Sequence, residues 1–344
     1  MVAQFEDLPA PARNLGGFHA RVLEELRLFV DYRESKPGEI AGRRSVVAAP
    51  RVPLRGRQPV RRNENGVRHA KFRGLRIHLG GERFSASRQV LGNRKGDVFV
   101  SHQGLTYGGF ITDQRATAEH LCQLFDAVNA WLKADGFRKV VYKPVPGIYH
   151  TMPAEEDLYA LFFRCHARLI ERDASSTIFM PHPIGFAESR LSGLRKARRE
   201  GLTVRESDDF PAFWTILTDN LRAKYDARPV HTLAEIQLLH SRFPSAIRLF
   251  MTYRGDTPLG GTVLYLTPQV VHTQYISASE QGKHLGALDL LFHHLIHLTD
   301  FHRPYFDFGT SAVGTTNELN ASLIFQKQGF GGRTVCYDWY EYDL

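Results

Sequence analysis

The stretch YFDFGTSAVGTTNELNASLIFQKQGFGG, residues 305–332, decides the fold. It opens with aromatic residues typical of a strand, passes through a polar turn, and continues as a short helix with an apolar side. Asp307 stands inside the strand, where acids are depleted, and Lys327 stands near the helix end, where the dipole favours a cation. The stretch therefore predicts a strand–helix unit that presents one acid and one lysine.

Helices and strands mix along the chain after residue 96. We expect strands over residues 97–102, 138–145, 202–206, 246–254, 260–267, 270–279, 305–309 and 333–342. We expect helices over residues 17–34, 117–137, 152–173, 186–201, 208–225, 232–243, 286–301 and 317–330. This order predicts the α/β (α+β) class, with mixed sheets flanked by helices.

The positive charge is concentrated near the N-terminus. Residues 41–76 hold ten Arg and one Lys against one acid, a charge of +10, whereas the whole chain carries +8, which leaves −2 for the rest. The segment is proline-rich and has no clear period, which predicts an irregular region over residues 1–95. It lacks interleaved aromatic residues, so it indicates nucleic-acid binding only weakly.

The remaining composition is that of a globular protein. Three cysteines, Cys122, Cys165 and Cys336, show no motif spacing, which predicts reduced, inert thiols. No apolar run approaches the ~20 residues of a membrane helix, and the first residues lack the order of a signal peptide. We therefore expect a cytoplasmic location and no membrane span.

Residues 97–344 resemble the GNAT acetyltransferase fold as it occurs in Fem-type transferases, in an uncharacterised bacterial branch. The residues that carry this resemblance are SHQGLTYGGF (101–110), KPVPGIYHTMPAEEDLYAL (143–161), LRKARREGLTVRE (194–206), RPVHTLAEIQLLHSRFP (228–244) and the opening stretch. The Fem-type proteins carry two GNAT-like halves, so the resemblance implies halves at 96–175 and 176–344.

The resemblance implies an N-acyltransferase that uses acyl-CoA, such as acetyl-CoA, and an amine acceptor. It points to an amino sugar or a cell-envelope precursor as that acceptor. Two alternatives stay open: aminoacyl-tRNA-dependent peptidyl transfer, as in Fem-type enzymes, with tRNA held by the basic segments, and a non-catalytic binding module.

Three residues are candidates for catalysis. The resemblance places Lys327 at the acyl-transfer site, where it would stabilise the developing oxyanion; otherwise it is a surface lysine at a helix end. Asp307 is a candidate general base or a group that orients the acceptor amine; otherwise it forms a salt bridge or caps a turn. His150 lies on a loop and is a second candidate base, or a structural loop residue.

Further polar and aromatic residues are candidates for binding the acceptor. Tyr107 precedes two glycines that would let a ligand approach closely, or that simply form a turn. His272 and Gln274 are expected on one face of their strand, because they are two positions apart. Asn320 either holds a substrate carbonyl or caps the following helix. The full set is Tyr107, Tyr149, His272, Gln274, Tyr275 and Asn320.

The loop ASEQGKHLGALDLL, residues 278–291, is the candidate donor site. A helix start offers free amides to a pyrophosphate, but the glycine spacing here differs from the GNAT motif. The donor candidates are Gln281, Gly282, Lys283 and Gly286, with Arg195 and Lys196 of a basic helix for donor phosphates. His293 and His297 have the spacing of a metal pair, but His294 stands where a metalloprotease has its Glu, so no metal is expected.

Overall fold

The protein is described by a computed structural model over residues 69–71, 78–79, 82–83, 91–101, 105–313 and 318–344. The predicted helix over residues 17–34 lies outside the described residues, and so does nearly all of the Arg-rich segment 41–76. Within the predicted irregular region 1–95, the described residues at 69–71 and 91–95 are strands.

The described residues build one mixed sheet of eleven strands, which confirms the predicted α/β (α+β) class. In spatial order its strands are β1 (His69–Lys71), β4 (Leu91–Lys95), β5 (Val98–Ser101), β6 (Lys139–Tyr142), β15 (Arg333–Asp343), β7 (Arg168–Phe179), β12 (Tyr305–Thr310), β11 (Val270–Ala278), β10 (Thr257–Leu266), β9 (Ile247–Arg254) and β8 (Leu202–Glu206). Two short ribbons pair β2 (His78–Leu79) with β3 (Glu82–Arg83) and β13 (Ala312–Val313) with β14 (Glu318–Leu319).

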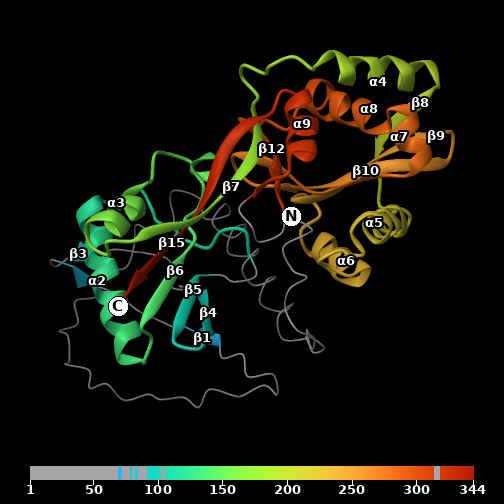
Figure 1. Ribbon diagram of the computed structural model, residues 1–344. Coiled ribbons are helices and arrows are strands. Elements are labelled where there is room, and N and C mark those ends of the chain that lie inside the picture. The colour runs from blue at the N-terminus through green and yellow to red at the C-terminus, as the bar shows by residue number, and fades with distance from the viewer. Residues whose placement is uncertain (1–68, 72–77, 80–81, 84–90, 102–104, 314–317) are drawn as a thin grey trace, which may run out of the picture. The chain divides into compact units, whose positions relative to one another are not determined.

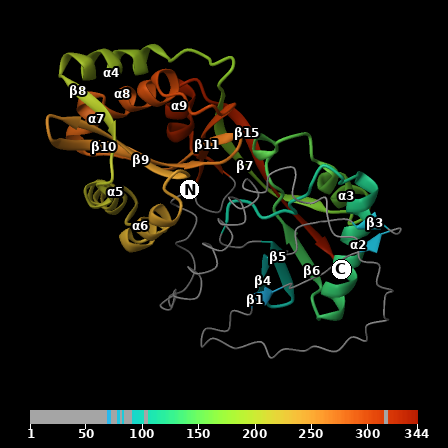
Figure 2. The same ribbon diagram turned by 180° about the vertical axis from the view of Figure 1, so that it is seen from behind.

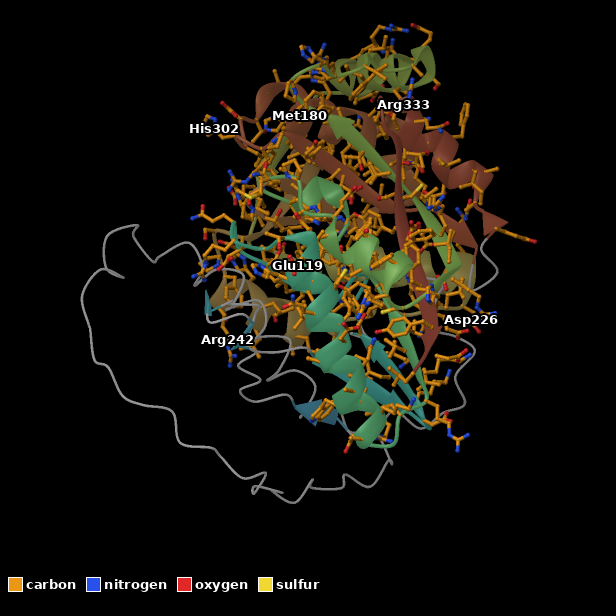
Figure 3. The ribbon with its side chains drawn as sticks, turned by 90° about the vertical axis from the view of Figure 1, so that its left-hand side faces the viewer. Glu119, Met180, Asp226, Arg242, His302 and Arg333 are labelled. Atoms are coloured by element: carbon orange, nitrogen blue, oxygen red, sulfur yellow. The ribbon has the colours of Figure 1, made fainter. Side chains whose placement is uncertain are left out.

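Helices flank this sheet. They are α2 (Ala118–Ala134), α3 (Glu156–Phe163), α4 (Glu188–Arg199), α5 (Phe210–Tyr225), α6 (Leu233–Arg242), α7 (Glu280–Leu285), α8 (Ala287–His293) and α9 (Ala321–Gly329). Figures 1 and 2 show α4 and α8 on one face of strands β8–β12, and α5 and α6 on the other face. The outer side of α2 is exposed at Glu119 (Figure 3), while its apolar side packs into a core with Phe99 and Tyr342.

The predicted helix over residues 152–173 is wrong in its second half. The helix α3 begins at Glu156, with Glu156 and Asp157 in its first turn, and ends at Phe163. His166 then has a left-handed backbone (φ 49°), which no helix tolerates, and the chain continues as the strand β7. The run Ser-Ser-Thr-Ile at 175–178 suits a strand because β-branched side chains pack well on a pleated surface.

The two longest strands, β7 and β15, pair antiparallel along most of their length. At its C-terminal end β15 also pairs with β6, and β7 pairs on its other edge with β12. The predicted boundary between residues 175 and 176 falls inside β7. One sheet therefore runs from the first predicted half into the second.

Alternation along β12 separates an apolar face from a polar one. Phe306 and Phe308 pack in a core with Leu291 and Phe292 of α8, and Val271 of β11 joins the same core. Since Asp307 lies between the two phenylalanines, its side chain points to the opposite face of the sheet.

The predicted helix over residues 286–301 is divided. Gly286 has a left-handed backbone (φ 76°) and separates α7 from α8, and α8 is followed by a π-helical turn over His294–Leu298. A β-carbon at Gly286 would lie 2.3 Å from the carbonyl oxygen of Gly193 on α4, so the glycine also permits close packing of α4.

Candidate active site

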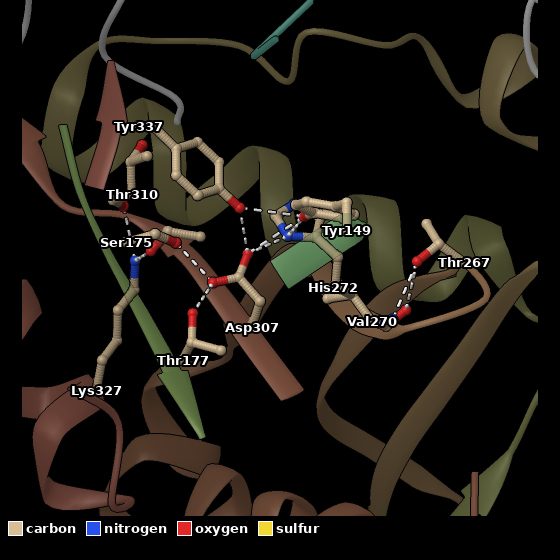
Figure 4. A network of polar contacts seen from close by, with 11 residues as sticks. Tyr149, Ser175, Thr177, Thr267, Val270, His272, Asp307, Thr310, Lys327 and Tyr337 are labelled. Atoms are coloured by element: carbon tan, nitrogen blue, oxygen red, sulfur yellow. Dashed lines mark hydrogen bonds and ion pairs between the residues drawn. The ribbon is translucent and has the colours of Figure 1, made fainter. Parts of the chain in front are cut away.

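Asp307 is fully buried and accepts hydrogen bonds on both carboxylate oxygens (Figure 4). The hydroxyls of Ser175 and Thr177 donate to Oδ1 over 2.6 and 2.8 Å. Nδ1 of His272 lies 2.7 Å from Oδ2, and the hydroxyl of Tyr337 donates to the same oxygen over 3.0 Å. Four side chains from three neighbouring strands thus surround one acid, which we call the Asp307 cluster.

Strand register places these side chains on one face. Asp307 is paired with Thr177 of β7 in the antiparallel ladder and with His272 of β11 in the parallel one. Paired residues point to the same face, so the three side chains meet above the sheet. Tyr337 joins them from β15, where it is paired with Asp173 of β7.

Two further tyrosines close the Asp307 cluster on one side. The hydroxyl of Tyr149 lies 3.1 Å from that of Tyr337 and 3.5 Å from Oδ2 of Asp307. The ring of Tyr107 lies over that of Tyr149, with 4.7 Å between centroids. Burial raises the pKa of Tyr149 and of Tyr337 well above the ordinary value, so both hydroxyls stay protonated and can donate.

The charge of Asp307 is stabilised despite its burial. Burial by itself would raise the pKa of this carboxyl, but the hydrogen bond from His272 and those from the hydroxyls of Ser175 and Thr177 hold that pKa below its ordinary value. The side chain is therefore a carboxylate at neutral pH.

Lys327 is buried beside the same strand. Its ammonium donates to the carbonyls of Gly309 over 2.9 Å and Thr310 over 2.7 Å. Gly309 has a left-handed backbone (φ 76°) at the point where the β12–β7 register shifts. Burial lowers the pKa of Lys327 to about 8, while the negative charge of Asp307 acts in the opposite direction. The structure thus brings the two predicted catalytic residues within electrostatic reach of each other.

The parallel strands β11 and β12 separate at the Asp307 cluster. They pair over three positions only, the last of which joins His272 to Asp307. Beyond this point β11 runs on to Ala278 and β12 to Thr310 without pairing to each other. The backbone edges that diverge here are suited to an extended ligand that would lie between them.

A β-bulge interrupts the strand β11 at Gln274. Across the β10–β11 ladder, Thr273 is paired with Leu264 and Tyr275 with Val263, so Gln274 is an extra residue. Because of the bulge, His272 lies on the same face as Tyr275. The ring of Tyr275 packs on that of Trp214 of α5, with 5.1 Å between the ring centroids. The side chain of Gln274 forms a hydrogen bond with Tyr275, and its position on the face of His272 stays a prediction.

Tyr275 is tied to the loop before α6. Its hydroxyl contacts Nδ1 of His231 at 2.6 Å and accepts from the His231 backbone amide over 3.2 Å. Burial raises the pKa of Tyr275 to about 12, so the hydroxyl is neutral.

A second group of buried charges lies on the same face of β7, one strand further from β12. Lys143, which follows β6, is only 1% exposed, donates to the carbonyl of Leu105 and lies 4.2 Å from the ring centre of Trp339. Burial lowers the pKa of Lys143 to about 8, against the opposing charges of Glu171 and Asp173. Glu171, Asp173, Ser175 and Thr177 occur at alternate positions of β7, so a polar row runs from Lys143 to Asp307.

Two predicted site residues have other structural roles. Nε2 of His150 lies 2.9 Å from the carbonyl oxygen of Val145 in its own loop, and no hydrogen bond joins His150 to Asp307 among the described residues. Asn320 is the N-cap of α9, where its side chain accepts from the Leu323 amide over 3.0 Å, which was one of its two predicted roles.

The predicted donor loop forms the short helix α7. Ser279 caps it by accepting from the Gly282 amide over 3.1 Å. The ammonium of Lys283 donates to Glu280 and, over 2.7 Å, to Asn220. Gly282 packs against β10, and Gln281 is exposed. Both glycines of this loop therefore have packing roles, because Gly286 serves the α4 contact.

On the basic helix α4, Arg195 is paired with Glu188, and Lys196 is half-buried. The rings of His293 and His297 lie 5.2 Å apart, and Phe186 packs against both. Within the part of the chain that the structure describes, no group of three or more His, Cys, Asp or Glu is placed to hold a metal ion.

A family model described as an acetyltransferase (GNAT) domain matches residues 188–316. The match covers α4 to β12 and includes both His272 and Asp307. This part of the chain is similar to GNAT acetyltransferase domains. The match ends before α9, so Lys327 and Tyr337 lie beyond the matched residues. No curated protein sequence matches the chain.

Several solved structures share the fold at low identity. FemX is 13% identical, with a TM-score of 0.57 over 81% of this chain and 88% of that chain. L-PGS from Bacillus licheniformis is 11% identical, with a TM-score of 0.52 over 76% and 83%. The C-terminal domain of an Agrobacterium fabrum protein, assigned as a lysylphosphatidylglycerol synthetase, is 13% identical, with a TM-score of 0.51 over 74% and 79%. These similarities show that the shared fold extends well beyond residues 188–316.

Among the described helices, none has the length and apolarity that crossing a membrane requires.

The sequence analysis did not identify Ser175, Thr177, Tyr337 or Lys143. The first two lie just after the predicted helix over 152–173, where the alternation Glu-Arg-Asp-Ala-Ser-Ser-Thr at 171–177 carries a period-two signal. Tyr337 stood in a predicted strand, but only the register with β7 reveals which of its aromatic residues faces Asp307.

We predict that Gly282→Ala destabilises the protein through packing alone. A β-carbon at this position would lie 2.1 Å from the carbonyl oxygen of Leu259, so backbone must move. The free energy of unfolding should fall by ~1–3 kcal/mol in chemical denaturation. Gly185→Ala is the control, since nothing lies within 4 Å of its β-carbon. Equal stability of the two variants would contradict this packing role.

We also predict a pH-dependent stability contribution from Lys143. Its pKa is about 8 in the folded protein against 10.5 when exposed, so the unfolded chain holds an extra proton between these values. The penalty of the buried charge, present below pH 8, is relieved as pH rises to 10.5. Relative to Lys143→Met, wild type should gain roughly 2–3 kcal/mol across this window in denaturant titrations.

Lys133→Met, at an exposed position on α2, is the matched control for Lys143→Met. Its stability difference from wild type should stay constant with pH. If the curve for Lys143→Met ran parallel to that of wild type, the ammonium of Lys143 would not be desolvated.

Proposed function

We propose that the protein is an N-acyltransferase that moves an acyl group from an activated donor onto an amine. The observation that carries the proposal is the Asp307 cluster at the point where β11 and β12 separate, inside the residues that match the GNAT family. Charged groups that are both buried and in contact are concentrated at functional sites in proteins.

The diverging strands supply the parts that acyl transfer needs. A carbonyl bound between β11 and β12 would lie beside His272 and near the ammonium of Lys327. Direct attack by a bound amine requires no covalent intermediate if both substrates are held together. The oxyanion that forms on the carbonyl needs a donor in a site that excludes water, and Lys327 is only 5% exposed.

Acyl-CoA is the first candidate donor, as the match to the GNAT family suggests. One observation favours the second candidate, an aminoacyl-tRNA, as in Fem-type enzymes. The ammonium of Lys283 is bound by Glu280 and Asn220, and both glycines of the predicted pyrophosphate loop are used in packing. The side chains of Gln281 and Lys283 are exposed, but that of Lys283 is bound by its two neighbours.

The acceptor in this proposal is an amine, with an amino sugar or a cell-envelope precursor as the first class to test. The aromatic rings of Tyr107, Tyr149 and Tyr337 lie against one another beside Asp307. Aromatic walls with a few convergent hydroxyls are typical of small-molecule sites.

The experiment is a matrix of donors and amines with the purified chain. Acetyl-CoA, longer acyl-CoA esters and charged tRNA are each incubated with amino sugars, amino acids and peptides, and acylated products are detected by mass spectrometry. Donors that bind should also raise the melting temperature. Transfer from acyl-CoA supports the first candidate, transfer from charged tRNA the second, and no acylated amine from any pair would refute the proposal.

We predict that Lys327→Ala lowers turnover at least ~100-fold, as loss of one oxyanion donor does in other enzymes. Because Lys327 also holds the carbonyls of Gly309 and Thr310, Lys327→Met is tested beside it to fill the space. Lys133→Ala, at an exposed site, should keep wild-type rates. Wild-type turnover in a folded Lys327 variant would remove this lysine from the mechanism.

A further inference from the structure

We infer that His272, and not Asp307, is the general base of this reaction, and that Asp307 is the residue that positions it. The inference rests on the proposed function for its chemistry. Its structural part, the protonation of each ring nitrogen, can be tested without any activity.

The tautomer of His272 follows from its neighbour. A carboxylate can only accept hydrogen bonds, and Oδ2 of Asp307 lies 2.7 Å from Nδ1 of His272. Nδ1 must therefore carry a proton. In the neutral ring the other nitrogen, Nε2, then has no proton and presents a lone pair, which is the form that a general base requires.

Nε2 has no hydrogen-bond partner among the described residues, since both contacts of this ring are made through Nδ1. The imidazole keeps 9% of its surface exposed, whereas Asp307 is fully buried. His272 is also the last residue of β11 that pairs with β12, so its ring stands where the two strands separate. A ligand between these strands would meet Nε2 before it met the carboxylate.

A second polar atom lacks a partner nearby. Tyr265 of β10 is directly paired with His272 in the antiparallel ladder, so both side chains point to the same face. The hydroxyl of Tyr265 is buried and has no hydrogen-bond partner among the described residues. Buried polar groups are normally satisfied, so this hydroxyl indicates a missing polar neighbour such as the acceptor.

The other candidate bases are less suited. Both oxygens of Asp307 are occupied by donors, and its pKa lies below the ordinary value, which makes it a weak base. His150 is bound to its own loop through Val145. Lys327 is held by two carbonyls.

Several titratable groups face the imidazole and belong in any account of its pH dependence. They are Asp307 on β12, Tyr149 from the η1 turn (Gly147–Tyr149), Tyr337 on β15, Tyr265 on β10 and Tyr275 on β11, with Lys327 acting through Asp307. Burial keeps the tyrosines neutral, so Asp307 and Lys327 are the charged neighbours.

In this reaction the acceptor ammonium gives up two protons, one to solvent and one to Nε2 of His272. The acceptor ammonium loses one proton to solvent and binds as a free amine. Its nitrogen attacks the acyl carbon, a C–N bond forms, and Nε2 takes the second proton. The C–S bond of a thioester, or the C–O bond of an ester, then breaks, and the imidazolium returns that proton to the leaving thiolate or alkoxide.

The first test is nitrogen-15 NMR of the histidine rings in the intact chain at neutral pH, with His272→Gln to assign the signals. We expect Nδ1 of His272 to be protonated and Nε2 to be bare, and Asp307→Asn to change this pattern. A ring protonated at Nε2 in wild type would overturn the inference whether or not the protein transfers acyl groups.

The second test is the pH profile of kcat/KM with a donor–amine pair from the matrix above. His272→Gln should lower kcat by ~10²-fold or more and abolish the fall of kcat/KM toward acid pH. His182→Gln, at an exposed histidine, should keep the wild-type profile. Circular dichroism and melting temperature establish that each variant is folded, and His272→Asn replaces the Gln variant if that one is not.

The outcomes separate the two proposals. An active wild type whose acid limb survives in a folded His272 variant overturns the base assignment and leaves the acyltransferase standing. Absence of any acyl transfer refutes the proposed function, whereas the NMR pattern still decides whether Asp307 positions His272.

Discussion

The structure depends on one buried negative charge. An isolated carboxylate in the middle of a sheet would be strongly destabilising, because burial removes its water without replacement. Asp307 is tolerated since hydroxyls of β7, an imidazole of β11 and a phenol of β15 replace that water. The requirement that these donors meet at one acid selects the register of three strand pairs: a slip of one residue would turn every donor to the other face.

The same requirement links the two predicted halves. His272 and Asp307 lie within the residues that match the GNAT family model, whereas Tyr149 comes from the turn after β6 and Tyr337 from the final strand, both outside that match. The site is therefore complete only where β7 and β15 join the halves in one sheet. The polar row on β7 continues from Asp307 to Lys143, and segment 105–110 contributes Tyr107 to the tyrosines while the Leu105 carbonyl accepts from Lys143.

Much of the fold could be predicted from the sequence, and the reasons for the failures are physical. Helices such as α2 and α5 have apolar residues at helical spacing, and the strands β9 to β12 are rich in apolar residues. Their own sequences are therefore enough to predict them. The strand β7 has a period of two only in polar residues that surround the buried acid, so it lacks the apolar alternation of an ordinary half-buried strand. The bulge at Gln274 and the division at Gly286 depend on neighbouring strands and helices, which no local pattern records. Asp307 and Lys327 could be chosen as candidate site residues because an acid in a strand and a lysine in a recognisable motif are local signals. Ser175, Thr177 and Tyr337 could not, because only the register of the paired strands places them beside Asp307.

The division of roles between Asp307 and His272 follows from the same electrostatics. When a general base takes a proton in a buried site, the positive charge that forms must be compensated where water is scarce. Asp307 already lies 2.7 Å from Nδ1 and is held as a carboxylate, so the imidazolium would form beside a fixed anion with no rearrangement. If Asp307 itself took the proton, its four close hydrogen bonds would lose their charged acceptor, and the buried ammonium of Lys327 would lose its opposite charge. The arrangement that makes the acid stable in the sheet is thus the one that makes it a poor base and a good partner for a histidine.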